Sequence, residues 1–387
     1  MSTSEIASPS PCPKTDMRLA LVHHQFGGGG GLEKYLVGLV PALIEAGHDL
    51  SFVTSRVVNP VPSAENLRIL KVDRLPISRT LRLLQFDREG ARIAADTNSD
   101  LILGFGQTTK QDIHRAGGGC HAVYSRSLAP LKRFSPKNRV ELDLERRLYT
   151  GGETRHFVVN ATKVAEELRQ EYNVSPDRIS VIHTPVDLKR FQPGERPKQQ
   201  LRQQLFAHRD SEKPAFLFVS LNHRRKGLDA LLEIWPEVDA DLWIAGAPSN
   251  AFYEGVIRKQ GIQDRIVWLG KRDDLPDFYR AAEAFVHPTL YDACANTVLQ
   301  AMASGLPAIV SANDGAKDFV EHEQTGLLLQ NPTDSAELLQ HVSQVLNLPA
   351  EDRTALGSRA RNRVSAQTWP NHLDAWNDVF ELVMKER

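Results

Sequence analysis

The chain opens with an apolar run, a cluster of glycines and an amphipathic stretch, and this order restricts the fold more than any other feature. Residues 17–24 predict a strand, and the glycines occupy 27–31. From Leu32 onward, apolar residues recur at helical spacing, and 50–54 predicts a second strand. A strand, a helix and a strand in this order form a βαβ unit, which requires a parallel sheet.

The alternation continues along the chain in two series. Further strands are predicted at 100–104, 157–160, 180–183, 215–221, 242–245, 266–269, 284–287 and 308–311. Helices are predicted at 162–172, 228–235, 296–304 and 372–385. We therefore expect an α/β protein with two Rossmann-like domains whose parallel sheets face each other across a cleft. The expected division is a disordered tail at 1–16, an N-terminal domain at 17–186, a linker at 187–213, a C-terminal domain at 214–365 and, at 366–387, a final helix that packs back toward the N-terminal domain.

Composition excludes several classes of protein. The formal net charge is -1, which disfavours a nucleic-acid binder, because phosphate backbones require a clustered positive field. The three cysteines, Cys12, Cys120 and Cys294, show no metal-ligand spacing and fit a reducing cytoplasm. Residues 1–16 have neither the basic nor the apolar region of a signal peptide, and no apolar run approaches membrane-spanning length. We expect a cytoplasmic location.

The glycine run lies where phosphate-binding loops occur, between a strand and a helix. It differs from both common phosphate motifs: Leu32 stands where a third Rossmann glycine would be, and no Gly-Lys-Ser/Thr follows. No acidic residue ends the next strand, so a nicotinamide enzyme is disfavoured. A flexible tight turn is the alternative interpretation.

Two later loops also follow predicted strands. The first, at 223–227, carries three consecutive cations next to a helix start, where positive charge is unfavourable unless an anion binds. The second leads from 286 through Asp292 and the small residues Ala293, Cys294 and Ala295 into a helix that carries Asn296 and Gln300 four residues apart. The alternatives are a solvated loop for the first and simple helix capping for the second.

Four blocks in the same order resemble the retaining glycosyltransferases of family 4, which have the GT-B fold, and among these the bacterial lipopolysaccharide-core hexosyltransferases. The blocks are FGGGGGLEKYLVGLVPALIEAGHDL (26–50), ISVIHTPVDLKRFQP (179–193), FVSLNHRRKGLDALLEI (218–234) and the segment from IVWLG to AIVS (266–311). The resemblance implies transfer of a hexose from a nucleotide-diphosphate sugar, with a UDP-sugar as the expected donor, to a glycan or lipid-linked acceptor. Cell-envelope polysaccharide or lipopolysaccharide biosynthesis is the implied setting.

The resemblance also assigns roles to individual residues. Gly30 and Gly31 would lie against the donor phosphates, and Lys226, helped by Arg225, would neutralise the diphosphate and stabilise the leaving nucleotide. His121 would lie near the transferred sugar, and Asp292 would contact its hydroxyls. The implied donor contacts further include Ala293, Cys294, Ala295, Asn296, Thr297 and Gln300. Catalytic roles would fall to His121, Lys226 and Asp292.

One departure from the family concerns its usual pair of glutamates. This chain has Asp292 and Gln300 in their place. Gln300 accepts only a neutral hydrogen bond from a ribose, which contributes about 0.5–1.5 kcal/mol against about 1.5–3 for a charged one. The departure keeps two alternatives open: a catalytically weak or silent nucleotide-sugar-binding scaffold, and an NDP-sugar epimerase on the same fold.

The expected chemistry needs neither a metal nor another cofactor. The single Asp-x-Asp string, Asp239-Ala240-Asp241, precedes a predicted strand instead of following one, and we interpret it as a polar turn. The family mechanism implies attack by the acceptor on the face that the nucleotide leaves, with the departing phosphate taking the acceptor's proton. Positioning and leaving-group electrostatics would then supply most of the acceleration.

The most basic stretch is 126–155, where cations alternate with apolar residues. Such a segment predicts contact with an anionic membrane surface, as a peripheral protein on the inner face of the cytoplasmic membrane. An ordinary amphipathic helix, with Glu141, Asp143 and Glu145 pairing the cations, is the equal alternative.

Overall fold

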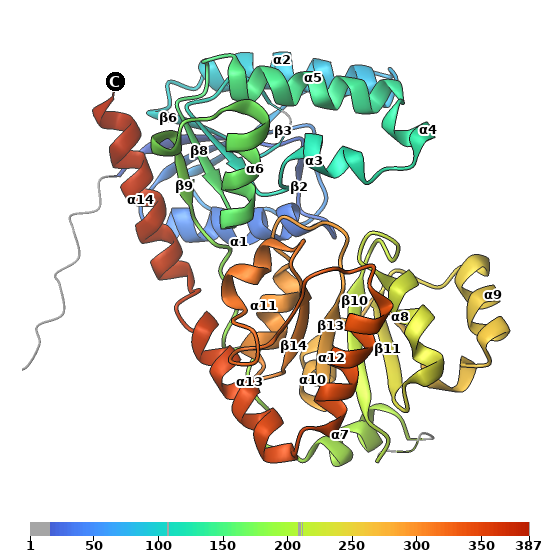
Figure 1. Cartoon of the computed structure of the whole chain (residues 1–387). Coiled ribbons are helices and arrows are strands. Elements are labelled where there is room, and N and C mark those ends of the chain that lie inside the picture. Colours follow the sequence, from blue (N-terminus) through green and yellow to red (C-terminus); the bar gives the residue numbers. More distant parts are fainter. Residues whose placement is uncertain (1–15, 107, 208–209, 211, 387) are drawn as a thin grey trace, which may run out of the picture. The chain divides into compact units, whose positions relative to one another are not determined.

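The computed structural model describes residues 16–106, 108–207, 210 and 212–386, so the tail expected at 1–16 lies outside the described residues except for Asp16. The chain forms two compact units (Figure 1). Unit 1 comprises the described residues up to Arg115, Asp143–His156 and the end of the chain from Leu382. Unit 2 comprises Ala116–Leu142 and Phe157–Glu381. The domain boundaries expected from the sequence stay a prediction.

The first sheet has seven strands in the order β5-β3-β1-β6-β7-β8-β9. The strands are β1 (Arg18–Val22), β3 (Asp49–Thr54), β5 (Leu67–Lys71), β6 (Leu101–Gly104), β7 (Ile113–Ala116), β8 (His156–Val159) and β9 (Ile179–Val181). The chain order reverses at β1, which pairs in parallel with both β3 and β6 through Leu19, opposite Leu50 and Leu101. Strands β2 (Gln25–Phe26) and β4 (Arg56–Val57) form a separate parallel pair.

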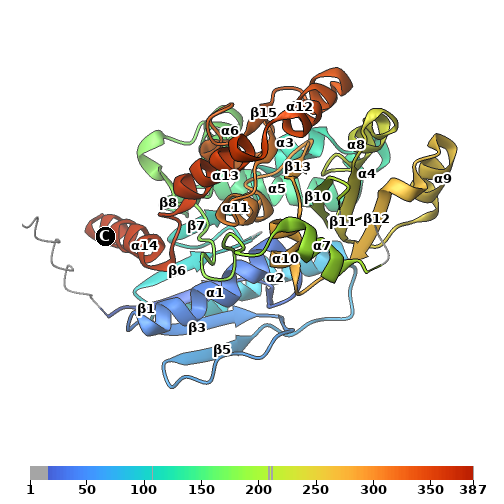
Figure 2. The ribbon, with the colours of Figure 1, turned by 90° about the horizontal axis from the view of Figure 1, so that it is seen from below.

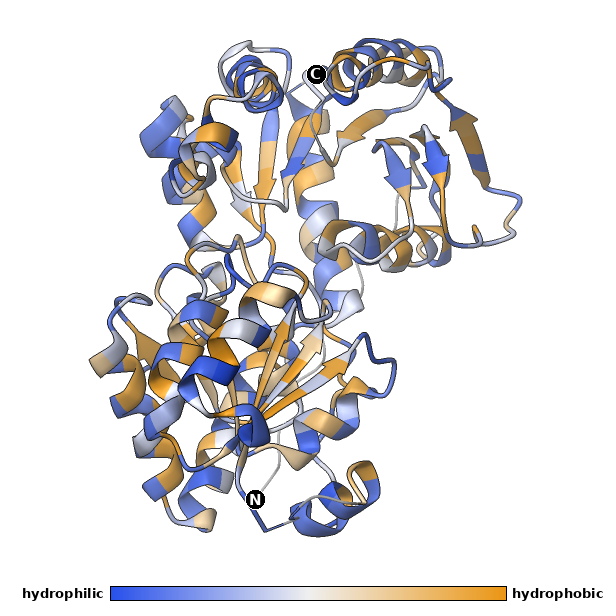
Figure 3. Ribbon diagram, turned by 90° about the vertical axis from the view of Figure 1, so that its right-hand side faces the viewer, coloured by the Kyte–Doolittle hydropathy of each residue, from blue (hydrophilic) through white to orange (hydrophobic). Residues whose placement is uncertain are grey.

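The second sheet has six strands in the order β12-β11-β10-β13-β14-β15, the doubly wound arrangement. The strands are β10 (Ala215–Ser220), β11 (Asp241–Gly246), β12 (Ile266–Gly270), β13 (Ala284–His287), β14 (Ala308–Ser311) and β15 (Leu327–Leu329). Strands β13 and β14 are buried at every position, and Figure 3 shows the central strands of this sheet almost uniformly apolar. Such strands are typical of a parallel sheet covered on both faces. Both predicted Rossmann-like folds are confirmed as parallel α/β sheets.

Helices cover both faces of each sheet. In unit 1, α1 and α2 lie on opposite faces (Figure 1), and Figure 2 shows β1, β3 and β5 side by side with α1 over them. In unit 2, apolar residues of α8, α9 and α12 form one core with Phe216 and Phe218 of β10. The helices are α1 (Gly31–Glu45), α2 (Arg79–Ala95), α3 (His121–Arg126), α4 (Pro130–Arg133), α5 (Pro136–Thr150), α6 (Thr162–Tyr172), α7 (Lys198–Leu205), α8 (Leu228–Ile234), α9 (Ala251–Gln260), α10 (Leu275–Ala281), α11 (Asn296–Ala303), α12 (Ser335–Asn347), α13 (Ala350–Val364) and α14 (Trp369–Lys385).

The polar segment predicted as a linker contains a helix, α7, that is anchored by charge. The guanidinium of Arg202, only 4% exposed, donates to Glu283 at 2.6 Å and to the Ala281 carbonyl at 2.9 Å. Lys198 donates to the same carboxylate at 3.0 Å. Burial opposes ionisation of Glu283, but these two cations lower its pKa overall. Because these anchors are polar, apolar periodicity gives no sign of the helix.

Most of the last helix, α14, belongs to unit 2, and His372 anchors its first turns there. His372 Nδ1 lies 2.8 Å from the His183 carbonyl, and the Trp376 indole donates to His372 Nε2 at 3.1 Å. Trp376 and Phe380 are buried. The expectation that this helix packs back toward the N-terminal domain stays a prediction.

Candidate functional site

The site residues of unit 2 gather where the strand order of the second sheet reverses. Strands β10 and β13 are neighbours in this sheet, and β11 and β14 lie on their outer sides. The basic loop 221–227 follows β10, and the loop 288–295 follows β13, so both leave the carboxyl edge of the sheet together. In open α/β sheets, ligands bind at this switch point.

Backbone contacts hold the two loops against each other. The carbonyl of Arg225 accepts from the Leu290 amide at 2.8 Å and from the Thr289 hydroxyl at 3.0 Å. Gly227 has φ +88°, and a Cβ there would lie 2.0 Å from the Pro288 carbonyl oxygen. Only glycine therefore allows the basic loop to approach the second loop this closely.

Lys226 lies at the centre of the site. Its side chain is 12% exposed and forms an ion pair with Asp292, whose side chain is 13% exposed. Its Nζ lies 3.4 Å from Nε2 of His287, which is fully buried and in turn lies 3.3 Å from the Asp314 carboxylate. Burial lowers the pKa of Lys226 to about 7, an effect that Asp314 opposes and Arg225 reinforces. The predicted basic and acidic residues, Lys226 and Asp292, are thus brought together.

The chemical consequence is an ammonium that is paired with the Asp292 carboxylate and lies next to the His287 imidazole. Burial keeps His287 neutral, because it lowers its pKa well below the usual value. His287, Asp292 and Asp314 have the spacing of a potential metal-binding group, but the Lys226 ammonium contacts two of the three. A diphosphate that reached Lys226 would compete with Asp292 for the same cation.

Asp314 completes the site and was not identified from the sequence. It is fully buried, and one carboxylate oxygen accepts from the amides of Ala295 at 3.0 Å and Ala316 at 2.9 Å. Burial raises its pKa, and Lys226 opposes this effect. The available signal was its place three residues after β14, at the same edge of the sheet as the other two loops.

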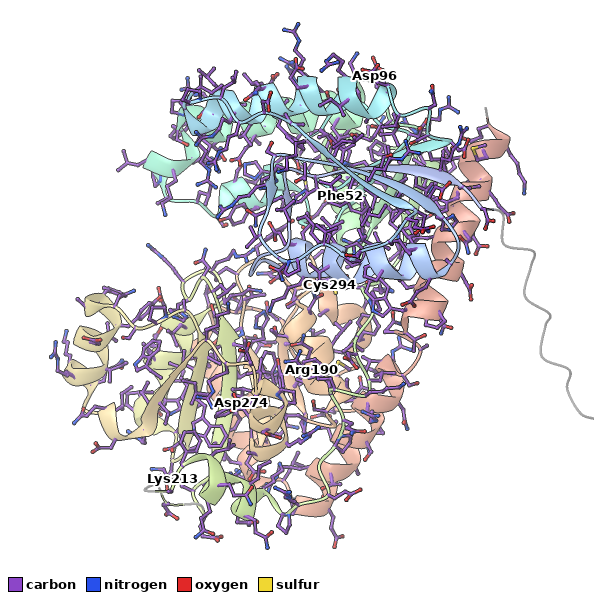
Figure 4. All side chains as sticks on the ribbon, turned by 180° about the vertical axis from the view of Figure 1, so that it is seen from behind. Phe52, Asp96, Arg190, Lys213, Asp274 and Cys294 are labelled. Carbon is purple, nitrogen blue, oxygen red and sulfur yellow. The ribbon has the colours of Figure 1, made fainter. Side chains whose placement is uncertain are left out.

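The small residues expected to contact the donor lie directly before α11, where Figure 4 labels Cys294. Ala293, Cys294 and Ala295 are buried. Because the Ala295 amide already donates to Asp314, the first-turn amides that remain for a phosphate are those of Asn296 and Thr297. Gln300 Oε1 accepts from the buried Tyr279 hydroxyl at 3.3 Å, so its expected ribose contact has a competitor.

A second group of residues, also unrecognised from the sequence, supports the glycine loop before His121. The buried Tyr291 hydroxyl accepts from the Cys120 amide at 2.9 Å and donates to Glu167 at 2.8 Å. Lys163 lies 3.9 Å from the Tyr291 ring centroid, a cation–π distance, and 2.5 Å from Glu167. Burial and the Glu167 carboxylate raise the pKa of Tyr291, so this hydroxyl keeps its proton.

His121 is the first residue of α3 and contacts α5. Its Nε2 lies 2.8 Å from Asn138 Oδ1 and 3.7 Å from Glu141, which Lys137 also pairs at 2.8 Å. The Asn138 amide nitrogen donates to the Arg133 carbonyl, so its oxygen faces the imidazole and Nε2 is the donor. These contacts fix the orientation of the ring. The role near the sugar stays a prediction.

The predicted glycines belong to unit 1. Gly30 is the N-cap of α1 and Gly31 its first helical residue. Lys226 and Asp292 belong to unit 2.

The Asp-x-Asp string does not form a paired site. Asp239 is almost fully exposed and lies 3.6 Å from Lys213, whereas Asp241 is buried at the first position of β11. Within the described part of the chain, neither residue belongs to a cluster of potential metal ligands.

Two parallel doubly wound sheets, with a buried cation at the switch point of the second, are typical of α/β proteins that bind ligands at strand ends. The family described as Glycosyltransferase Family 4 matches residues 29–190, and the one described as Glycosyl transferases group 1 matches 213–348. The chain therefore belongs to these glycosyltransferases, as the sequence blocks indicated.

Individual relatives agree with this assignment. A probable transglycosylase from Burkholderia thailandensis is 28% identical over 89% of this chain and 90% of its own length. The lipopolysaccharide glucosyltransferase WaaG of Escherichia coli is 20% identical over 87% of this chain and 91% of its own length.

Solved structures show the same fold. A structure of WaaG, a glycosyltransferase involved in lipopolysaccharide biosynthesis, matches with a TM-score of 0.80 at 18% identity, covering 94% of this chain and 99% of the other. The Anabaena protein HepE in complex with UDP-glucose matches with a TM-score of 0.70 at 16% identity, covering 96% and 100%. The fold is GT-B. Among the described residues, no helix combines the length and apolarity needed to cross a membrane.

Proposed function

We propose that the chain is a retaining hexosyltransferase that uses a UDP-sugar and acts on a glycan or lipid-linked acceptor in cell-envelope biosynthesis. The observation that carries the proposal is the buried Lys226 at the switch point, held between Asp292 and the His287–Asp314 pair. The similarity to WaaG and to HepE, which was solved with UDP-glucose, supports the choice of reaction and donor.

The proposed mechanism assigns the leaving group to cations of the chain. Lys226 would exchange Asp292 for the donor diphosphate, and Arg225, one residue earlier, would add a second positive charge. The departing nucleotide leaves with extra negative charge, which a pre-positioned ammonium stabilises without reorganisation. We propose that chemistry at this site needs no metal, because the lysine supplies the charge that a metal would otherwise supply.

Asp292 would act in sugar recognition once the diphosphate has displaced it from Lys226. Its carboxylate would then accept hydrogen bonds from hydroxyls of the transferred sugar, at the place where the diphosphate has taken the ammonium. In this arrangement, diphosphate binding by Lys226 and sugar recognition by Asp292 are coupled, because both require the diphosphate to replace Asp292 at the ammonium. His121 is proposed to contact the sugar from the loop that Tyr291 supports.

The test is a transfer assay with UDP-, GDP- and ADP-sugars, with and without EDTA, followed by NMR of the anomeric carbon in the product. Retained configuration from one nucleotide-sugar, insensitive to EDTA and lost in Lys226→Ala, is the expected result. Binding without transfer would instead assign a nucleotide-sugar-binding scaffold, and sugar isomerisation without an acceptor would assign an epimerase. Inverted configuration would overturn the mechanism.

For a lipid-linked acceptor, we propose that the turn around α4 contacts the membrane. Leu131 is 92% exposed and Phe134 is 66% exposed, which is unusual for large apolar side chains on neighbouring turns. Lys132 and Arg133 lie between them in the sequence and Arg139 follows in α5. None of these three cations forms an ion pair with a described residue. Each cation near an anionic surface contributes about 1 kcal/mol. The rest of the basic stretch follows the amphipathic alternative, since Leu144 and Leu148 of α5 are buried.

Sedimentation with phosphatidylglycerol vesicles tests this surface. A Leu131→Ser, Phe134→Ser double variant should lose vesicle binding, whereas Phe252→Ser should not. Phe252 in α9 is a matched control because it is 65% exposed. Equal binding by all three proteins would remove the membrane proposal and leave the glycosyltransferase proposal intact.

A further inference from the structure

Two histidines and a glutamate of unit 1 converge at the switch point of the first sheet. His23 and His24 directly follow β1, the strand at which the sheet order reverses, and Glu33 lies in the first turn of α1. The three residues therefore bracket the glycine run 27–31. None of the three residues belongs to the Lys226 site, and none has a part in the proposed glycosyl transfer.

The geometry brings one ligand atom of each residue into a common space. These atoms all lie within 4.8 Å of one another. His23 Nε2 is 3.9 Å from Glu33 Oε1, and the centroids of the two imidazole rings are 4.5 Å apart. In a tetrahedral site with bonds of about 2.1 Å, ligand atoms lie about 3.4 Å apart, so only small side-chain rotations separate this arrangement from a coordinating one.

His23 is the residue that most needs a partner. It is 2% exposed, and neither of its ring nitrogens makes a hydrogen bond to any described residue. Buried polar atoms are nearly always satisfied, so an unpaired imidazole aimed at a carboxylate and a second imidazole points to a ligand.

The glycines around the cluster leave room for these side chains. A Cβ at Gly30 would lie 2.0 Å from Glu33 Oε2, and one at Gly106, two residues after the end of β6, would lie 3.0 Å from His23 Nδ1. Any larger residue at position 30 would displace the carboxylate. The glycine run thus permits the cluster as well as the turn.

We propose that His23, His24 and Glu33 bind a divalent transition metal of the zinc class. Two imidazoles and one carboxylate are a donor set that zinc accepts, and the exposed position of His24 leaves a fourth ligand position open to solvent. A bound ion links the end of β1 to the start of α1 and so closes the glycine run into a fixed loop. Calcium and magnesium, which prefer oxygen ligands, are disfavoured.

The second cluster with metal-ligand spacing serves as the contrast. In that group, His287, Asp292 and Asp314, the Lys226 ammonium already contacts two members. A metal ion there would have to displace a paired cation, whereas no lysine or arginine is paired with His23 or His24 among the described residues.

The test is a titration of untagged full-length protein with Co²⁺ followed by visible absorption, and with Zn²⁺ followed by calorimetry. One ion per chain with the absorption of tetrahedral Co²⁺ is the expected result, together with a Zn²⁺-dependent rise in Tm. His24→Gln and Glu33→Gln should each weaken binding by about 100-fold or more, since even outer partners of a metal site contribute about 10–100-fold. Both residues are at least partly exposed, so these variants should fold.

His322→Gln is the matched control, because His322 is an exposed histidine within 4.0 Å of a glutamate in unit 2. It should leave stoichiometry and affinity unchanged. Absence of a stoichiometric ion in the wild type, or equal binding by the two ligand variants, would overturn the proposal. Neither outcome depends on glycosyl transfer.

Discussion

Under the proposed function, the buried position of Lys226 should make nucleotide-sugar binding depend on pH. The free protein has a pKa of about 7 at this lysine, lowered mainly by burial from the ordinary 10.5. A donor diphosphate bound as proposed would attract the ammonium and raise that pKa in the complex. We therefore expect affinity for UDP-glucose to be highest at and below pH 7 and to fall as pH rises above it.

The size of the effect follows from proton linkage. Above its pKa, the lysine must be protonated for each binding event, which costs about 1.4 kcal/mol, or tenfold in Kd, per pH unit. Full recovery of the ordinary pKa in the complex would set an upper limit of about 5 kcal/mol. Asp292 in contact with the ammonium favours protonation, so the decline starts no lower than pH 7. At pH 9 we expect Kd to be up to about 100-fold weaker than at pH 7.

Isothermal titration of UDP-glucose from pH 6 to 9, in buffers of different ionisation heat, measures both the affinity and the proton uptake. A nucleotide-sugar has no terminal phosphate, so the step near pH 6 that belongs to such groups does not interfere. Lys226→Arg keeps its charge throughout and should show a flat profile. Cys294→Ser tests the contribution of a nearby thiol, which raises the pKa of Lys226, and a decline that persists in this variant assigns the titration to the lysine.

Two results would refute the reasoning. A flat wild-type profile from pH 7 to 9 would mean that Lys226 is charged throughout and that burial is compensated. If Lys226→Arg showed the same decline in affinity as the wild type, the titrating group would be a residue other than Lys226. By contrast, Lys226→Ala should weaken binding by about 2–5 kcal/mol at pH 7, the usual cost of removing one member of a buried charge pair.

Three further outcomes concern stability, each measured by urea unfolding. Tyr291→Phe should lower the free energy of unfolding by about 1–3 kcal/mol, because a buried carboxylate and an amide lose their partner; a change below about 0.5 kcal/mol would contradict the network. Gly227→Ala should lower the free energy of unfolding by about 1–3 kcal/mol or more, since its φ of +88° and the nearby Pro288 carbonyl both oppose a Cβ. Gly255→Ala is the control: Gly255 lies in α9 with open space around it, so this variant should be neutral or stabilising by up to about 1 kcal/mol. Glu283→Gln should cost about 3–5 kcal/mol near neutral pH by breaking a buried ion pair. Because the folded-state pKa of Glu283 is lowered, its contribution to stability is present above pH 4.5 and is lost as pH falls below it. The unfolding free energies of the wild type and Glu283→Gln should therefore converge in acid. A difference that stayed constant with pH would show that the charge is not responsible.

Periodicity predicted the elements whose residues are buried for local reasons. The expected strands at 284–287 and 308–311 coincide with β13 and β14, and the expected helix at 162–172 coincides with α6. These segments have clear apolar runs or a clear apolar stripe, so the signal is in neighbouring residues. Several elements without such a signal, among them α7, were not predicted, because their contacts are polar or distant in sequence.

The residues of the candidate site also fall into two groups, those that the sequence indicated and those that only the structure revealed. The loops that carry Lys226 and Asp292 drew attention because each follows a predicted strand, and strand ends are where α/β proteins bind ligands. The roles of the two residues came from the resemblance of these blocks to the family-4 glycosyltransferases. Asp314 and Tyr291 were not identified from the sequence, because their importance comes from partners that the sequence does not bring near: Asp314 accepts from the Ala295 amide, and Tyr291 donates to Glu167 on α6.

By itself, the sequence determined the class of fold, the family and the strand ends at which charged residues meet, because these depend on local periodicity and on motifs contiguous in the chain. Only the tertiary structure decided which charge pairs with which. It placed the Lys226 ammonium on Asp292 in a buried setting and brought His23, His24 and Glu33 together across the glycine run. Pairing and burial set the pKa and the need for a ligand, and both depend on distances in space that residue order alone does not specify.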